Sequence, residues 1–288
     1  MAEPADGGPA RQMTRRGFLT RAGAGTLAVF AIACDGTDTD RPGALGGTAG
    51  PSVEPVPERR DLRLSARPAA SVAGPIRSGE SSLGLARERD AILYVPPGLR
   101  PDRPAALVVC LHGASGDALG GLGLFRRHAD DAGLVLLAPA SRQGSWDFRI
   151  GSGPDAPFVD RALAAVLERV PVDPTRLAVA GFSAGASFAL SLGLANGDLF
   201  SHVIALSPGY LLRHVYRGSP RVFIAHGTRD TTLSIGSSSR RIVPELRGEG
   251  FDVTYVEFDG AHEAPPRITS RAVGWLLGQD TETPTSRR

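Results

Sequence analysis

The sequence predicts an α/β domain in which helices cover both faces of a mostly parallel central sheet. From Leu83 onward, short apolar runs with β propensity alternate with stretches of helical length. Strands that are separated by helix-length stretches need crossover connections, and such connections produce parallel pairs. The predicted strands are Ala91–Val95, Ala106–Leu111, Leu134–Ala138, Leu177–Ala180, His202–Leu206, Val222–Ala225 and Val253–Phe258.

The stretch from Phe158 to Val170 has the amphipathic pattern that this fold class requires. Its apolar residues recur at helical spacing while charged residues take the opposite side, so one face is suited to a sheet. These apolar residues are Val159, Ala162, Leu163, Val166, Leu167 and Val170. Asp155 and Pro157 predict an N-cap and a first-turn proline, and Pro171 predicts the end of the helix.

The first 34 residues indicate a targeting segment rather than part of the fold. The segment around Arg15 and Arg16 resembles the twin-arginine export signal, and the apolar run from Ala22 to Ala33 is short for a membrane span. The residues up to Cys34 resemble a lipoprotein cleavage box, although Ala31 stands where leucine is commonest. We therefore expect export by the twin-arginine route. The exported protein is then expected at the outer face of the cytoplasmic membrane or in the periplasm, with Cys34 as a candidate for lipidation; the alternative is cleavage and secretion.

Residues 35–82 predict a disordered tether because they are rich in Gly, Pro, Thr, Ser and Arg and nearly lack aromatic residues. A marginal edge strand around Leu62 to Ala66 is the one element expected there. The α/β domain then spans residues 83–279, and residues 280–288 predict a disordered tail. Cys110, the second of the two cysteines, lies in a predicted strand and indicates a small buried hydrophobe.

The charge pattern excludes several functional classes. The net charge is +2, and every Lys/Arg position is an arginine, scattered among acidic residues without a basic stripe. We therefore expect no nucleic-acid partner. The absence of lysine excludes a phosphate-loop lysine, a pyridoxal Schiff base and a Ser–Lys dyad, so a nucleophilic serine would have to use a histidine.

The stretch Gly181–Gly185, Gly-Phe-Ser-Ala-Gly, lies where a predicted strand gives way to an apolar helix over residues 184–194. A glycine on each side of Ser183 lets the backbone turn sharply and exposes the hydroxyl at the helix N-terminus. The helix dipole and the amide of Ala184 then lie beside the position where negative charge would develop. The same pattern also occurs in ordinary turns, so its context decides its meaning.

Residues just past the strands have priority, because ligands of open α/β sheets bind at the carboxyl ends of the strands. His112 begins one such loop, and the amide of Ala114 in that loop can converge with the amide of Ala184 on one oxygen atom. We expect His112 to brace the loop rather than to act as a base. Asp230 and His262 follow two later predicted strands.

The order Ser183, Asp230, His262 is the order of serine, acid and histidine in α/β-hydrolases. The alternatives are that Asp230 caps the following helix and that His262 is an ordinary surface histidine. His226 is the rival base and Asp259 the rival acid, although Asp259 is so near His262 in sequence that it would struggle to reach the far ring nitrogen.

These motifs make the chain resemble the phospholipase/carboxylesterase family of the α/β-hydrolase superfamily, close to polyhydroxybutyrate-depolymerase-like esterases. The resemblance extends from about Ala91 to Leu277. It rests on the sequences 111–113, 181–185, 226–230 and 260–263. Ala184 departs from intracellular carboxylesterases, which often carry glutamine there.

The resemblance implies an α/β-hydrolase fold, a catalytic triad of Ser183, Asp230 and His262, an oxyanion hole from Ala114 and Ala184, an ester substrate and no cofactor. The stretch 207–221 is too short for a large cap domain, so we expect an open site. Trp146 and Tyr210 are candidates for substrate contact, and local packing is an equal alternative for Trp146. The leading hypothesis is a carboxylesterase or lysophospholipase-like serine hydrolase; the alternatives are an exported polyester or feruloyl-ester hydrolase and a catalytically inactive binding module.

Overall fold

The computed structural model describes residues 62–69, 72, 77–147, 153–212 and 215–279. The strands are β1 (Gly79–Ser82), β2 (Ala91–Val95), β3 (Ala105–Leu111), β4 (Val135–Pro139), β5 (Val172–Phe182), β6 (His202–Leu206), β7 (Arg221–Gly227) and β8 (Val253–Phe258). The helices are α1 (Ala118–Gly123), α2 (Arg126–Ala132), α3 (Asp155–Leu167), α4 (Ala184–Ala195), α5 (Ser239–Gly248) and α6 (Pro266–Leu276).

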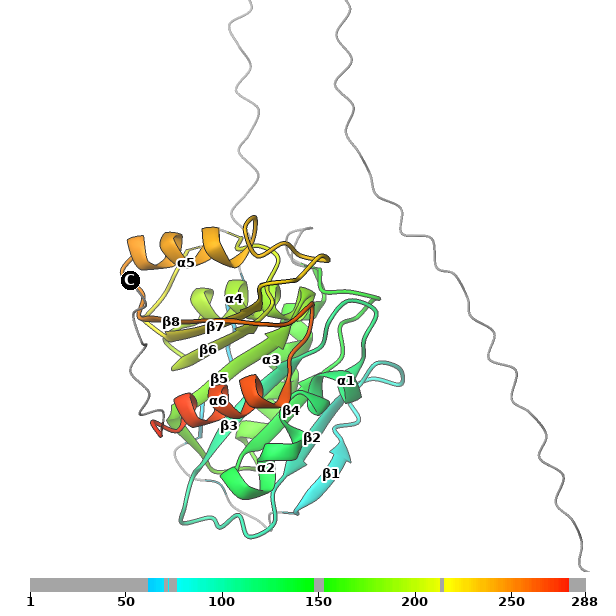
Figure 1. Ribbon diagram of the computed structural model, residues 1–288. Coiled ribbons are helices and arrows are strands. Elements are labelled where there is room, and N and C mark those ends of the chain that lie inside the picture. Colours follow the sequence, from blue (N-terminus) through cyan, green and yellow to red (C-terminus); the bar gives the residue numbers. More distant parts are fainter. Residues whose placement is uncertain (1–61, 70–71, 73–76, 148–152, 213–214, 280–288) are drawn as a thin grey trace, which may run out of the picture. The chain divides into compact units, whose positions relative to one another are not determined.

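The strands form one sheet in the order β1-β2-β4-β3-β5-β6-β7-β8 (Figure 1). The pairs β1–β2 and β2–β4 are antiparallel, and every pair from β4–β3 to β7–β8 is parallel. The predicted mostly parallel sheet is therefore confirmed. All seven predicted strands are present, and β1 is an additional edge strand.

Both faces of the sheet are covered by helices, as the alternation of side chains along β3 shows. Leu107, Val109 and Leu111 belong to the apolar cluster under α3, α4 and α5. Val108 and Cys110 point the other way, into the cluster under α1, α2 and α6 (Figure 1). A strand that is buried on both faces is apolar throughout, which explains its unbroken hydrophobic sequence. Burial raises the pKa of the Cys110 thiol, in keeping with its expected role as a buried hydrophobe.

The start of α3 differs from the sequence prediction. The helix begins at Asp155, and the flanking N-cap position is Pro154, so Asp155 does not cap the helix with its side chain. Its buried carboxylate instead accepts hydrogen bonds from the amides of Arg142 (2.5 Å) and Asp147 (2.7 Å). Burial raises the pKa of Asp155 to about 6. The side chain thus anchors the loop that precedes the helix.

Residues 62–69 and β1 lie within the predicted tether, yet both pack on the domain. Leu62 and Leu64 are 3% and 1% exposed, whereas Arg63 between them is exposed. The buried side-chain amide of Asn196 accepts from the amide of Leu64 and donates to the carbonyl of Leu62, both at 2.8 Å. We call residues 62–69 the strap. Because the strap pairs through a side chain and no strand pair includes it, the expected edge strand around Leu62 is not formed.

No helix in the described part of the chain is long and apolar enough to cross a membrane. The targeting segment with Arg15, Arg16 and Cys34, most of the predicted tether and the predicted tail lie outside the described residues.

Candidate active site

Ser183 occupies a sharp turn between β5 and α4. Its backbone has φ 56° and ψ −119°, a conformation that is strained for a residue with a Cβ atom. The flanking glycines permit the turn: a Cβ atom on Gly181 would lie 2.3 Å from the carbonyl carbon of Gly185. The amide of Ser183 donates to the carbonyl of Leu206 at 2.9 Å, which ties the turn to β6. This geometry holds the hydroxyl clear of the backbone.

His262 connects Ser183 to Asp230. Its Nδ1 lies 2.6 Å from Oδ2 of Asp230, and its Nε2 lies 2.8 Å from Oγ of Ser183. A carboxylate only accepts hydrogen bonds, so Nδ1 carries the proton and Nε2 accepts from the serine hydroxyl. The imidazole is therefore oriented to take the proton of Ser183.

The carboxylate of Asp230 is buried and satisfied on both oxygens. Oδ1 accepts from the amides of Thr232 (2.9 Å) and Leu233 (2.8 Å), and Oδ2 accepts from His262. Burial acts to raise the pKa of Asp230, but these bonds outweigh it and lower the pKa below the usual value. The alternatives considered for Asp230 coexist, since one oxygen stabilises the local turn while the other faces the histidine.

The two rival residues lie elsewhere. His226 is fully buried and its ring nitrogens face Ser239, Leu233 and Asp230 rather than Ser183. The carboxylate of Asp259 is 76% exposed and pairs with Arg229 at 2.6 Å. Neither residue is placed to act directly on the serine.

The loop from His112 to Gly116 runs beside Ser183. A Cβ atom on Gly113 would lie 3.6 Å from Cβ of Ser183. Among the described residues, no protein acceptor takes a hydrogen bond from the amide of Ala114 or Ala184. Two unused donors beside a serine hydroxyl are what an oxyanion hole requires.

His112 braces this loop, as expected. Its Nε2 accepts from the amide of Ser141 at 3.0 Å, so Nδ1 carries the proton and donates to the carbonyl of Gly113 at 2.7 Å. Burial lowers the pKa of His112, which keeps the ring neutral. Arg89 adds a donor to the carbonyl of Gly116 at 2.8 Å. No sequence pattern pointed to Arg89, because its side-chain contacts are 23 to 52 residues away.

Of the two candidates for substrate contact, Trp146 packs locally. Its ring is 3% exposed and stacks on Phe188 with ring centroids 5.0 Å apart. Its Nε1 donates to the carbonyl of His112 at 2.8 Å, so the indole supports the loop from His112 to Gly116. Tyr210 is half-buried against the core, and its amide lies 3.4 Å from Oγ of Ser187, which is one helical turn beyond Ser183.

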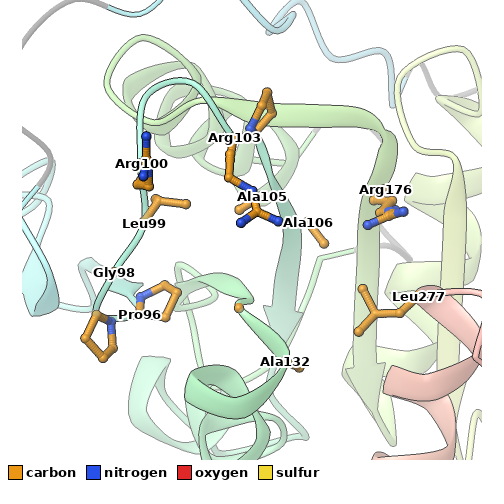
Figure 2. A pocket seen from close by; sticks show the side chains of 13 residues that line it. Pro96, Gly98, Leu99, Arg100, Arg103, Ala105, Ala106, Ala132, Arg176 and Leu277 are labelled. Atoms are coloured by element: carbon orange, nitrogen blue, oxygen red, sulfur yellow. The ribbon is translucent and has the colours of Figure 1, made fainter.

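A cavity of about 250 Å³ lies beside the amino-terminal end of β3, far along the strands from the carboxyl ends that carry the triad. Figure 2 shows residues that line it, among them Pro96, Gly98, Leu99 and the arginines Arg100 and Arg103. Neither Ser183, Asp230 nor His262 lines it. In the described residues, no group of three or more His, Cys, Asp or Glu side chains is placed to hold a metal ion.

Comparisons with known proteins bear on the fold and the family. The model of the family Esterase, described as "Putative esterase", matches residues 82–235. No curated protein matches the chain. Among solved structures, fluorophosphonate-binding serine hydrolase F of Staphylococcus aureus is 15% identical with a TM-score of 0.57, over 71% of this chain and 99% of that chain.

Two further structures show the same fold. An S-formylglutathione hydrolase of Staphylococcus aureus is 15% identical with a TM-score of 0.55, over 65% of this chain and 92% of the other. The esterase Est2 of Thermogutta terrifontis is 18% identical with a TM-score of 0.54, over 73% of this chain and 95% of the other. At these identities the likeness shows the fold alone.

Proposed function

This chain belongs to the esterase family within the α/β-hydrolase superfamily and is a carboxylic ester hydrolase, and from that premise we propose that it works through an acyl-enzyme on Ser183. The single observation that carries the proposal is the continuous hydrogen-bonded path from Ser183 through His262 to Asp230. This path disfavours the catalytically inactive alternative, because a binding module does not need all three groups to be hydrogen-bonded to one another.

In the first half of the reaction, Oγ of Ser183 attacks the ester carbonyl carbon while Nε2 of His262 takes the hydroxyl proton. Asp230 holds the ring and stabilises the imidazolium that forms. The tetrahedral intermediate then collapses: the bond to the alcohol oxygen breaks, and the alcohol leaves with the proton from His262.

The second half repeats these steps with water as the nucleophile. His262 takes a proton from water, the hydroxide attacks the acyl carbon, and Ser183 leaves with the proton, so the carboxylic acid is released. In both halves the amides of Ala114 and Ala184 donate to the developing oxyanion. By analogy with other serine hydrolases, losing one such donor costs about 2.7–4 kcal/mol of barrier.

We propose that the substrates are soluble esters with short to medium acyl chains, as in carboxylesterases and lysophospholipase-like enzymes. The connection between β6 and β7 contains no helix in its described residues, 207–212 and 215–220. A cap that encloses a long acyl chain has no counterpart there. Each methylene left in water forgoes about 0.8 kcal/mol of binding free energy.

The proposal is tested by labelling with a fluorophosphonate probe beside an ester panel. Ser183 should be labelled in the native protein, and Ser183→Ala should abolish both labelling and turnover. Across an acyl-length series, kcat/KM should not rise steeply toward long chains or jump on emulsified substrate; either result would indicate a lipase-like pocket. Polyester and feruloyl-ester substrates in the same panel test the alternative specificity.

We also propose that the enzyme acts outside the cytoplasm, exported by the twin-arginine route and anchored through Cys34. The support is the sequence around Arg15 and Arg16 and the residues that end in Cys34. An exported ester hydrolase would meet its substrates at the membrane surface or beyond it.

A further inference from the structure

His226 is the second histidine in contact with the carboxylate of Asp230. It lies near the end of β7, and its side chain is 0% exposed. Its Nε2 is 2.8 Å from the carbonyl oxygen of Leu233 and 3.1 Å from Oδ2 of Asp230. Its Nδ1 is 2.7 Å from Oγ of Ser239, the first residue of α5.

These partners determine the tautomer of the ring. A carbonyl oxygen and a carboxylate both only accept hydrogen bonds, so Nε2 must carry a proton. It donates this proton to the carbonyl of Leu233 and lies 3.1 Å from Oδ2 of Asp230. Nδ1 is then free to accept from the hydroxyl of Ser239. Burial is the largest cause that lowers the pKa of His226, so the ring is neutral and adds no charge beside the triad.

We propose that His226 is a positioning residue, which holds the carboxylate of Asp230 in the plane that His262 needs. The proposal rests on the catalytic role proposed above for Ser183, Asp230 and His262. Nε2 of His226 lies 3.1 Å from Oδ2 of Asp230, the same oxygen that accepts the hydrogen bond from His262.

The contacts form a closed ring that resists rotation of the carboxylate. Asp230 accepts from the amide of Leu233 through Oδ1, and the carbonyl of the same Leu233 accepts from Nε2 of His226, which lies 3.1 Å from Oδ2. Rotation about the terminal bond of Asp230 would break bonds on both oxygens. Ser239 extends this support to α5, so the acid is held by β7, its own turn and a helix.

The competing interpretation is that His226 only fills space in the core. The two interpretations differ in which atom matters. If His226 positions Asp230, the donor at the Nε2 position is essential; if it only packs, any side chain of similar volume serves as well. A loss of packing lowers the melting temperature, whereas a loss of positioning lowers kcat. Measuring both quantities therefore separates the two interpretations.

The test compares His226→Gln with His226→Asn, two neutral amides that differ by one methylene. Glutamine can place an N–H donor at the Nε2 position, whereas asparagine reaches only the Nδ1 position beside Ser239. His226→Phe keeps a ring without any donor. His202→Asn is the matched control, because His202 is also a buried histidine bonded to a serine but lies at the start of β6, away from the triad.

For each folded variant, kcat and KM on a soluble ester and the second-order rate of fluorophosphonate labelling are measured beside the melting temperature. We expect His226→Asn and His226→Phe to lower kcat and the labelling rate about 10- to 100-fold with KM unchanged within about twofold. His226→Gln should retain kcat within about fivefold of the native enzyme. His202→Asn should lower the melting temperature and leave kcat unchanged.

The proposal is overturned if His226→Asn keeps native kcat, if His226→Gln is as impaired as His226→Asn, or if His202→Asn loses as much activity. If His226→Phe does not fold, the comparison of the two amides decides. Failure of the proposed function is recognised separately: Ser183→Ala would then remain active, whatever the His226 variants do.

Discussion

The first turn of α4 touches the end of β3 so closely that a Cβ atom on Gly185 would lie 2.3 Å from the carbonyl oxygen of Leu111. The carbonyl of His112 would be 2.4 Å away. This contact brings the loop that carries the amide of Ala114 beside the start of α4, which carries the amide of Ala184. Glycine at position 185 is thus required by the approach of two backbones.

Gly185→Ala is therefore expected to disrupt the site. The new methyl group meets backbone atoms, which cannot move aside without shifting the loop from His112 to Gly116. A displacement of about 1 Å costs on the order of 100-fold in rate. Gly274→Ala in α6 is the control, since nothing lies within 4 Å of its added Cβ atom. Measured kcat/KM should fall at least tenfold in the first variant and stay native in the second.

The triad should behave as one unit. Ser183→Ala, His262→Ala and Asp230→Asn are each expected to lower kcat by several orders of magnitude, and the triple variant should be little worse than Ser183→Ala alone. Circular dichroism checks that each variant folds. Asp259→Asn should have a mild effect, because its carboxylate pairs at the surface with Arg229. Full activity in a folded Ser183→Ala protein would refute the assignment.

The strap should contribute to stability through Asn196. Its side chain bonds Leu64, Leu62 and Leu192, each at 2.8 Å, in a buried environment. Asn196→Ala leaves buried backbone groups without partners, at a cost of about 1–3 kcal/mol for each. Urea unfolding should show a loss of this order.

Asp198→Asn provides the comparison for the strap. Asp198 pairs with Arg63 and Arg67 on the surface, and exposed ion pairs contribute about 0–1 kcal/mol. If this variant loses as much stability as Asn196→Ala, surface charge rather than the buried amide holds the strap.

His202 should make the folded state sensitive to acid. Burial, followed by the charge of Arg221, lowers its pKa to about 4, so the unfolded chain binds a proton at a pH where the folded protein does not. This stabilisation is present above the unfolded pKa of about 6.5 and is lost as pH falls toward 4. The shift corresponds to about 3 kcal/mol.

The measurement compares the native protein with His202→Asn by urea unfolding at pH 7.5 and pH 4.5. The difference between the two proteins isolates the contribution of His202. This comparison is needed because Asp155 has the opposite effect: its pKa is raised, so its contribution to stability increases as pH falls through about 6. The advantage of the native protein should shrink at pH 4.5. An advantage that is the same at both values would show that His202 titrates normally.

The localisation proposal predicts two fractionation results. Replacing Arg15 and Arg16 by lysine should block export, because the twin-arginine pair is read as an address. Cys34→Ala should move the protein from the membrane fraction to the soluble exported fraction. If the native protein with Cys34 intact is soluble and exported, the segment is a cleaved signal only.

The sequence by itself determined the fold class and the order of the three proposed catalytic residues. Strands buried on both faces must be apolar along their whole length, as in β3, so they stand out as unbroken runs without any knowledge of their neighbours. The turn at Ser183 is equally visible, because only small residues fit where the strand and helix meet. Asp230 and His262 were identified because parallel strands bring their carboxyl ends to one edge.

Only the tertiary structure decided which side chains support these groups. Arg89 bonds Gly116, 27 residues away, and Asn196 bonds Leu62, 134 residues away; no periodicity links such partners. His226 lies only four residues before Asp230, but its contacts with Asp230 and Ser239 depend on the turn after β7 and on the packing of α5. Trp146 could equally have faced a substrate, and its burial depended on the position of Phe188. The strap resembles a polar linker in sequence because its two buried leucines are too few to form a core alone. They are buried because they join the core cluster of the domain, where Asn196 and Asp160 bond the backbone of the strap.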